Sequence, residues 1–141
     1  MQFRNQFAFL SNMYPCTVAM PDGFTYRCAE AAFQAQKTND PSEKLRFTSL
    51  SGPDAKRLGR HVKLRPDWNE YRVTAMRQVI DAKFRNPVLA EQLKTVSGEI
   101  IEDNTWNDRF WGRCNGTGEN RLGILLMEKR DTLLSHEATT C

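Results

Sequence analysis

The sequence predicts an α+β fold that is predominantly helical, arranged as a single compact domain with a small antiparallel β element near the N-terminus. The chain has 141 residues, enough to bury one hydrophobic core without disulfides or metals. Its composition, 40% hydrophobic and 26% charged, is typical of globular domains. Apolar residues follow a helical period along most of the chain, and turn-bounded runs gather in its first part. We expect this domain to cover residues 1–135 and a loose tail to follow at residues 136–141.

The β element is expected near the N-terminus, where three short runs are typical of strands. These runs are residues 7–10, 16–20 and 24–26. The second and third flank Pro21-Asp22-Gly23, which is typical of a tight turn, so they predict a hairpin. A further strand is predicted at residues 99–102.

Helix signals follow the predicted hairpin. Residues 29–37 contain no Gly, Pro, Val or Ile and are rich in strong helix formers. The segment Asp40-Pro41-Ser42-Glu43 predicts a capped helix that runs to about residue 48. Asp67, with Glu70 three residues later, predicts the start of the best-defined helix. Two further helices are predicted around residues 89–93 and over residues 122–133.

The cysteines and histidines give no support for a metal site. The four cysteines are widely spaced, form no Cys-x-x-Cys pair and have no neighbouring histidine. His61 and His136 are far apart, which argues against a hydrolase triad. The sequence also lacks a Walker loop and a dinucleotide fingerprint. We therefore expect neither a metal nor a cofactor.

The first twelve residues mix polar side chains with aromatic ones. They contain no continuous apolar run typical of a secretory signal or a membrane span. We therefore expect a cytoplasmic protein with reduced thiols and no membrane association.

Charge is distributed unevenly along the chain. Residues 41–65 contain seven basic and two acidic residues, a local charge of +5, and residues 67–108 contain eight acidic and five basic ones, a local charge of −3. A basic patch beside an acidic one would suit an anionic ligand with a cationic transition state. A solvated surface and a nucleic-acid binding patch are the alternatives.

One helix presents a polar face. Glu30, Gln34 and Lys37 are spaced i, i+4 and i+7 on the first predicted helix, so they project from the same side. This face is a candidate catalytic surface, and the alternative is a solvated stripe with an internal Glu–Gln hydrogen bond.

Two further candidates lie elsewhere in the chain. Asp108 occurs in a loop with Trp106, Phe110 and Trp111, whose rings could exclude water from its carboxylate. Asp is also common in turns, which is the alternative role. Trp68 stands in the first turn of its helix, where it could stack on a base or anchor the core.

These residue types fit glycosidic bond cleavage. The reaction needs support for an oxocarbenium-like centre and a group that activates water or protonates the leaving base. Glu30 and Asp108 could divide these tasks on either side of the ribose C1. In an alternative mechanism, Lys37 attacks C1 of an opened sugar and forms a Schiff base.

Several ordered segments resemble the signature blocks of the YbiA-like or NADAR family, over residues 7–134. The segments are Phe9-Leu10-Ser11-Asn12-Met13-Tyr14-Pro15, Glu30-Ala31-Ala32-Phe33-Gln34-Ala35-Gln36-Lys37, Gly59-Arg60, Trp68 with Met76, Lys83-Phe84, Asn107-Asp108-Arg109-Phe110-Trp111-Gly112 and Gly118-Glu119-Asn120-Arg121-Leu122-Gly123.

The resemblance implies the YbiA-like fold and N-glycosidase activity on a phosphorylated ribose joined to a base or amine. Family substrates are phosphoribosylaminopyrimidine intermediates of riboflavin synthesis and ADP-ribosylated guanine in nucleic acid. The family's catalytic positions fall on Glu30, Asp108 and Lys37. The expected substrate-binding residues are Trp68, Asn12, Gln34, Arg60, Trp111, Gly112 and Asn120, with Arg60 as the candidate for phosphate.

One position departs from the family pattern, since Ala31 stands where the family's helix block usually has histidine. This departure leaves open a second function, a non-catalytic module that binds ADP-ribose or a related nucleotide. It also leaves open whether the substrate is a free metabolite or a modified nucleic acid.

Overall fold

The structure is a computed structural model that describes residues 1–139, and its backbone divides into two compact units. The middle unit is Asn12–Lys83, and the terminal unit combines Met1–Ser11 with the segment that begins at Phe84. The two names refer to the places of the units in the sequence.

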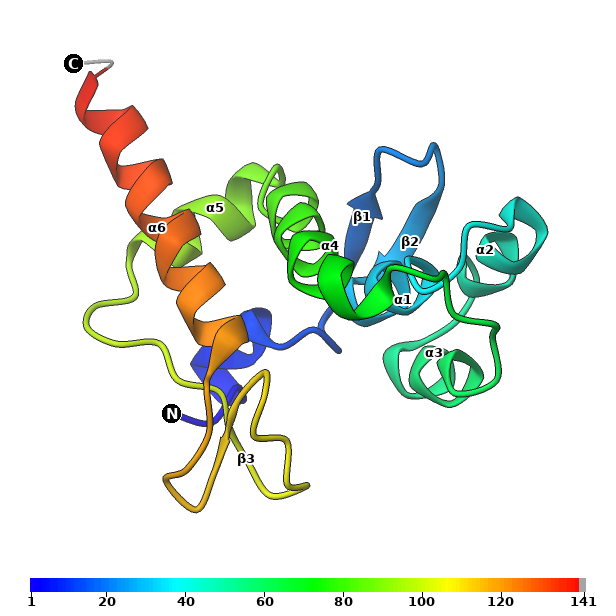
Figure 1. Ribbon diagram of the computed structural model, residues 1–141. Helices are drawn as coiled ribbons and strands as arrows, with labels where there is room; N and C mark the ends of the chain where they lie inside the picture. Colours follow the sequence, from blue (N-terminus) through cyan, green and yellow to red (C-terminus); the bar gives the residue numbers. More distant parts are fainter. Residues whose placement is uncertain (140–141) are drawn as a thin grey trace. The chain divides into compact units, whose positions relative to one another are not determined.

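The middle unit begins with the predicted hairpin. Strands β1 (Pro15–Ala19) and β2 (Thr25–Cys28) pair antiparallel, with Val18 opposite Tyr26 (Figure 1). Gly23 lies in the turn with φ of +87°, a backbone conformation that glycine adopts without steric cost. Val18 and Tyr26 are both buried, so this side of the hairpin faces the core.

Four helices complete the middle unit. They are α1 (Ala29–Ala35), α2 (Pro41–Phe47), α3 (Gly52–Gly59) and α4 (Trp68–Lys83). Helix α1 is the centre of the unit, because it contacts both strands and the other three helices. Every residue of α1 is buried, so its Glu and Gln side chains lie inside the unit.

Polar caps explain where two of these helices begin. The Asp40 side chain accepts a hydrogen bond from Ser42 N at 2.9 Å, as the sequence predicts for α2. The Ser51 hydroxyl accepts a longer one, at 3.4 Å, from Asp54 N at the start of α3, a helix that the sequence analysis did not predict. Helix α1 ends two residues before Lys37, so the predicted end at residue 37 was too late.

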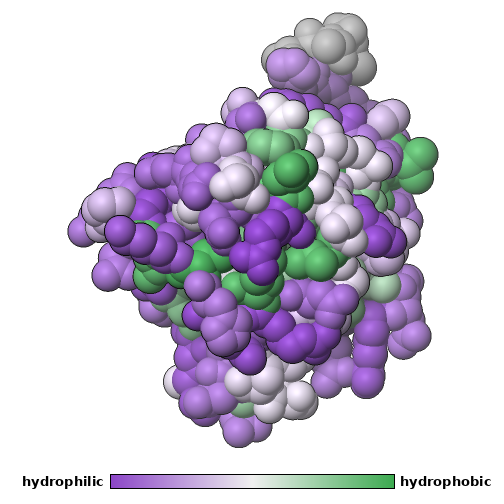
Figure 2. All heavy atoms as spheres, turned by 90° about the vertical axis from the view of Figure 1, so that its right-hand side faces the viewer, coloured by the Kyte–Doolittle hydropathy of each residue, from purple (hydrophilic) through white to green (hydrophobic). Residues whose placement is uncertain are grey.

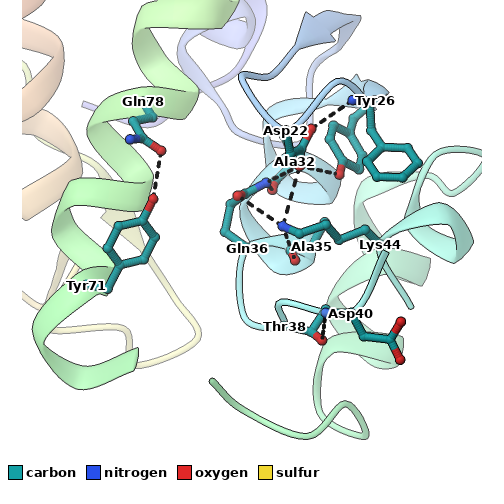
Figure 3. Close-up of polar contacts among 11 residues, drawn as sticks. Asp22, Tyr26, Ala32, Ala35, Gln36, Thr38, Asp40, Lys44, Tyr71 and Gln78 are labelled. Atoms are coloured by element: carbon teal, nitrogen blue, oxygen red, sulfur yellow. Dashed lines mark hydrogen bonds and ion pairs between the residues drawn. The ribbon is translucent and has the colours of Figure 1, made fainter. Parts of the chain in front are cut away.

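The far end of α1 is joined to α2 and the hairpin by a polar network (Figure 3). Oδ2 of Asp22 accepts hydrogen bonds from the Tyr26 hydroxyl at 2.9 Å and from Gln36 Nε2 at 3.1 Å. Lys44 of α2 donates to Gln36 Oε1 and to the Ala35 carbonyl, both at 3.3 Å. These bonds satisfy polar groups at the C-terminal end of α1 and hold that end in place.

The terminal unit contains the 3₁₀ helix η1 (Asn5–Leu10), α5 (Pro87–Lys94), the two-residue strands β3 (Asp103–Asn104) and β4 (Arg113–Cys114), and α6 (Arg121–Thr139). Strands β3 and β4 pair in parallel, and α5 packs on α6.

Two predicted strands in the terminal unit are wrong. Residues 7–10 belong to η1, where local bonds such as Phe7 N to the Arg4 carbonyl replace pairing with a strand. Residues 99–102 are not a strand, because Glu102 N donates instead to the Asn120 side chain at 2.9 Å. A short apolar run is compatible with either conformation, and these partners were not visible in its local pattern.

The chain end differs in part from the prediction. Helix α6 continues through Thr139, so residues 136–139 of the predicted loose tail are helical. Residues 140 and 141, the rest of that predicted tail, lie outside the described residues.

The predicted fold class, predominantly helical α+β with a small antiparallel element, is confirmed. On the side that carries α2 and α3, hydrophilic residues predominate and hydrophobic residues form smaller areas between them (Figure 2). Within residues 1–139, no helix is both long and apolar enough to cross a membrane.

Candidate active site

Helix α1 presents a carboxylate in its first turn. Glu30 is 8% exposed, and its backbone N–H donates to the Asn12 carbonyl at 2.8 Å. The thiol sulfur of Cys28 caps the same turn by accepting from Ala31 N at 3.5 Å. The turn that carries Glu30 is therefore held by groups on both sides of it.

Gln34 and Glu30 are joined directly inside the unit. Gln34 Nε2 donates to Glu30 Oε1 at 2.8 Å, one helical turn away, and Gln34 is only 6% exposed. The two side chains share one face, as the sequence predicted, but that face is buried. The solvated stripe of the alternative interpretation is therefore wrong for these two residues, whereas the Glu–Gln hydrogen bond that it included is present.

Lys37 lies beyond the C-terminal end of α1, in a turn. Both its backbone N–H and its carbonyl are hydrogen-bonded. Its N–H donates to the Gln34 carbonyl at 3.2 Å, and its carbonyl accepts from Arg65 N at 2.7 Å. Burial lowers the pKa of Lys37 below its ordinary value. The Glu30 carboxylate opposes this, and the cations Arg60 and Lys56 lower it further. Lys37 is thus an amine that loses its proton more readily than an ordinary lysine.

Lys37 lies within electrostatic range of two further cations, Arg60 and Lys56. Arg60 is exposed and follows the last residue of α3, whereas Lys56 lies one turn earlier on that helix. Other basic residues of segment 41–65 pair with nearby acids, as Arg57 does with Asp54. Within residues 1–139, Arg60 has no ion pair, so its guanidinium is available to an anionic ligand.

Trp68 is a packed residue of the middle unit. It is 8% exposed, and its ring lies 5.3 Å from that of Phe33 on α1, inclined by 51°. Asn12 also packs inward, where its Nδ2 contacts Met76 Sδ of α4 at 3.5 Å. The structure shows structural contacts for both residues, and their roles in substrate binding remain predictions.

Asp108 belongs to the terminal unit and organises its own loop. Its Oδ1 accepts from Phe110 N at 3.1 Å and from Trp111 N at 2.9 Å. The Asn104 side chain binds the Asp108 backbone at two points. Its Oδ1 accepts from the Asp108 N–H at 3.0 Å, and its Nδ2 donates to the Asp108 carbonyl at 2.9 Å. The turn role considered for Asp108 is therefore observed, and its catalytic role remains a prediction.

Trp111, Gly112 and Asn120 surround the same loop. The Trp111 ring meets that of Phe110 edge to face, with centroids 4.8 Å apart. A Cβ atom at Gly112 would lie 2.0 Å from Glu102 Oε2 and 2.3 Å from the Glu102 carbonyl, so the position requires glycine for space.

Asn120 is engaged at both ends of its side chain. It is 2% exposed, accepts from Glu102 N and donates to the Ile100 carbonyl, both at 2.9 Å. Asn120 therefore joins two buried backbone groups. Its contact with a substrate remains a prediction. The structure divides the sequence-predicted site residues between the two units. The middle unit contains Asn12, Glu30, Gln34, Lys37, Arg60 and Trp68, and the terminal unit contains Asp108, Trp111, Gly112 and Asn120.

Two features of the middle unit were missed by the residue-level reasoning. Lys83 is 1% exposed, and burial lowers its pKa to about 8 despite the opposing effect of Cys16 and Cys28. Gly59 lies against the Gln34 carboxamide. Both residues occur in the signature segments, but only contacts between elements reveal what they touch.

Metal ligands do not cluster in the described part of the chain. No group of three or more His, Cys, Asp or Glu side chains is arranged to hold a metal ion among residues 1–139.

The middle unit combines the buried carboxylate of Glu30, the amine of Lys37 with its lowered pKa, and the available guanidinium of Arg60. This combination suits a hydrolase that acts on an anionic substrate.

Comparisons with known proteins identify the family of this chain. The NADAR domain family matches residues 2–134, and this chain belongs to it. N-glycosidase YbiA from Shigella boydii serotype 4 is 39% identical over 118 residues, which are 79% of this chain and 73% of that protein. A riboflavin biosynthesis protein from Vibrio vulnificus is 36% identical over 135 residues, which are 91% of this chain but only 36% of that protein.

A solved structure agrees with the fold. The NMR structure of the Escherichia coli protein YbiA superimposes with a TM-score of 0.83 at 31% identity, covering 98% of this chain and 86% of that one. The predicted family and its fold are therefore confirmed, and the predicted glycosidase class agrees with the names of these relatives.

Proposed function

We propose that this chain is an N-glycosidase that hydrolyses the C–N bond between a phosphorylated ribose and a base or amine. The observation that carries the proposal is the buried Glu30 carboxylate, held by Gln34 beside Lys37 and the available Arg60. The relatives named N-glycosidases support the reaction type.

In the proposed reaction, water adds to C1 of the ribose and the base leaves with a proton. A carboxylate near C1 stabilises the positive charge that develops there and can accept the proton of the attacking water. We assign this role to Glu30 and the phosphate to Arg60, whose planar guanidinium binds phosphate oxygens in pairs. A catalytic role for Asp108 in the terminal unit stays a separate prediction.

The lowered pKa of Lys37 supports a covalent route as the alternative mechanism. The neutral Nζ would attack C1 of the opened sugar, and the base would leave with the proton that Nζ gives up. Water would then hydrolyse the resulting Schiff base and restore the lysine. Borohydride added during turnover should reduce this intermediate to a stable adduct on Lys37, detectable by peptide mass spectrometry. Turnover without any adduct would favour direct attack by water.

Two substrate classes fit the proposal, a phosphoribosylaminopyrimidine and ADP-ribosylated guanine in an oligonucleotide. Their shared features are a ribose C–N bond and a phosphate. The riboflavin biosynthesis protein from Vibrio vulnificus supports the first class. The free thiols of Cys16, Cys28 and Cys114 support a cytoplasmic site of action.

The deciding experiment incubates purified protein with each substrate and follows base release by mass spectrometry. Release that disappears in Glu30→Gln would support the reaction and identify the substrate class. Binding without release from either substrate would instead support the nucleotide-binding function, in which the buried Ala31 stands where the family pattern usually has histidine.

A further inference from the structure

We propose that Gln34 and Gly59 act together to position the Glu30 carboxylate, with the Gln34 amide as the positioning group and Gly59 as the surface on which it rests. This inference rests on the proposed function, because it assumes that Glu30 is the carboxylate that acts on the substrate.

The first observation is the one-sided bonding of the Gln34 carboxamide. Its Nε2 donates to Glu30 Oε1 at 2.8 Å, whereas its Oε1 is buried and has no hydrogen-bond partner within residues 1–139. The orientation of the amide follows from this contact, because an ionised carboxylate only accepts hydrogen bonds. Gln34 therefore offers its donor to Glu30 and leaves its own acceptor unsatisfied.

An unsatisfied buried oxygen is unfavourable, and native proteins contain few of them. If this position served packing alone, an apolar side chain of similar length would fill the space without an unpaired oxygen. The contact with Glu30 is the interaction that such a side chain could not provide. A hydrogen bond to one carboxylate oxygen fixes the rotation of the carboxylate and favours its charged form.

The second observation concerns the residue that faces the unpaired oxygen. A Cβ atom at Gly59 would lie 1.9 Å from Gln34 Oε1, 2.7 Å from its Cδ and 3.3 Å from its Cγ. Contacts this short would displace the amide. The carboxamide thus lies directly on the Cα of Gly59, at the end of α3.

Backbone conformation does not explain this glycine. Gly59 is not among the glycines with positive φ in residues 1–139, and it occupies a helical position where alanine would be more stable. The requirement for glycine is therefore spatial, and the space is used by Gln34. Helix α3 acts on the Glu30 carboxylate through this contact.

The test measures kcat and KM for Gln34→Met, Gly59→Ala and the double variant in the base-release assay. Since methionine matches glutamine in length but cannot donate, we expect Gln34→Met to lower kcat by about 10-fold to 100-fold, the range for a lost hydrogen bond to a charged group. We expect KM to change by less than about threefold, because in this proposal Gln34 bonds to Glu30 and not, as the sequence analysis had expected, to the substrate.

Gly59→Ala should lower kcat to a similar extent, because the added methyl group displaces the same amide. In the Gln34→Met background the alanine should have little further effect, since the hydrogen bond is already absent. Gly52→Ala is the control, the same change on the same helix, where the Cβ would meet the side chain and the Cα of Met13 and no atom of Gln34. Full kcat in Gln34→Met, or independent multiplication of the two losses, would overturn the proposal.

A measurement without substrate separates this inference from the proposed reaction. In ¹⁵N NMR spectra, assigned by comparison with Gln34→Met, we expect one side-chain amide proton of Gln34 to exchange slowly with water in the wild-type protein. Gly59→Ala should make it exchange rapidly. Rapid exchange in the wild type would overturn the positioning role even if the enzyme is active, whereas absence of wild-type turnover with a protected amide would count only against the proposed function.

Discussion

The sharpest stability prediction concerns Asn120, because its side chain is hydrogen-bonded to two buried backbone groups. Its Oδ1 accepts from Glu102 N and its Nδ2 donates to the Ile100 carbonyl, both at 2.9 Å and both in buried surroundings. Asn120→Ala would remove both of these hydrogen bonds. Each lost hydrogen bond to a buried group costs about 1–3 kcal/mol, so the two losses should lower the free energy of unfolding by about 2–6 kcal/mol.

Backbone conformation adds a second term, because Asn120 has a φ of +53°. Alanine in the left-handed region costs about 1 kcal/mol more than a residue that tolerates it. Asn115 provides a matched control, since it also has a φ of +53° but is exposed and makes no side-chain hydrogen bond within residues 1–139. Asn115→Ala should therefore lose only the backbone term.

The assay is urea denaturation of both variants and the wild type, with the free energy of unfolding obtained by linear extrapolation. The difference between Asn120→Ala and Asn115→Ala isolates the two hydrogen bonds, and we expect at least about 2 kcal/mol. Equal losses in the two variants would refute the reasoning, because they would show that the Asn120 contacts add nothing beyond backbone conformation.

Two other predictions concern the middle unit. Asp22→Ala should lower the free energy of unfolding by about 2–3 kcal/mol, because Tyr26, Gln36 and Lys44 lose a shared acceptor; a loss below about 0.5 kcal/mol in urea denaturation would contradict this. Burial holds the pKa of Lys83 at about 8, below its ordinary value of 10.5. Between these values the unfolded lysine binds more protons than the folded one, so Lys83 should contribute a rise in stability with pH, of about 0.8 kcal/mol from pH 7 to pH 8.5. Burial raises the pKa of the Cys16 and Cys28 thiols, which contribute in the opposite direction. Urea denaturation at the two pH values should therefore show a stability change that is more favourable in the wild type than in Lys83→Met; equal changes would contradict the assignment.

The fold was predictable where local signals agree with the final contacts. The hairpin around Pro21-Asp22-Gly23 and the cap at Asp40 are examples, because their hydrogen bonds join residues close in sequence. Helix α3 carried comparable signals, Ser51 followed by Pro53, but the glycines at both of its ends obscured them. The segment 99–102 was misassigned, since its backbone pairs with the side chain of Asn120, 18 residues away.

The candidate site also combines features that local sequence signals predict with features that depend on distant contacts. Helical spacing placed Glu30 and Gln34 on one face, and the structure joins them at 2.8 Å. Spacing could not predict that this face is buried, because burial depends on the neighbouring elements around α1. The unpaired oxygen of Gln34 and its contact with Gly59 were likewise beyond prediction, since they depend on how α3 packs on α1.

The most direct test of the account is base release by the wild type and by Glu30→Gln, measured side by side on a phosphoribosylaminopyrimidine and an ADP-ribosylated guanine oligonucleotide. The substitution retains the shape of the side chain and removes only its charge and its capacity to accept a proton. We expect the wild type to release free base from at least one substrate, and Glu30→Gln to release none while its affinity stays within about tenfold. Equal release by the two proteins would contradict the central role of Glu30.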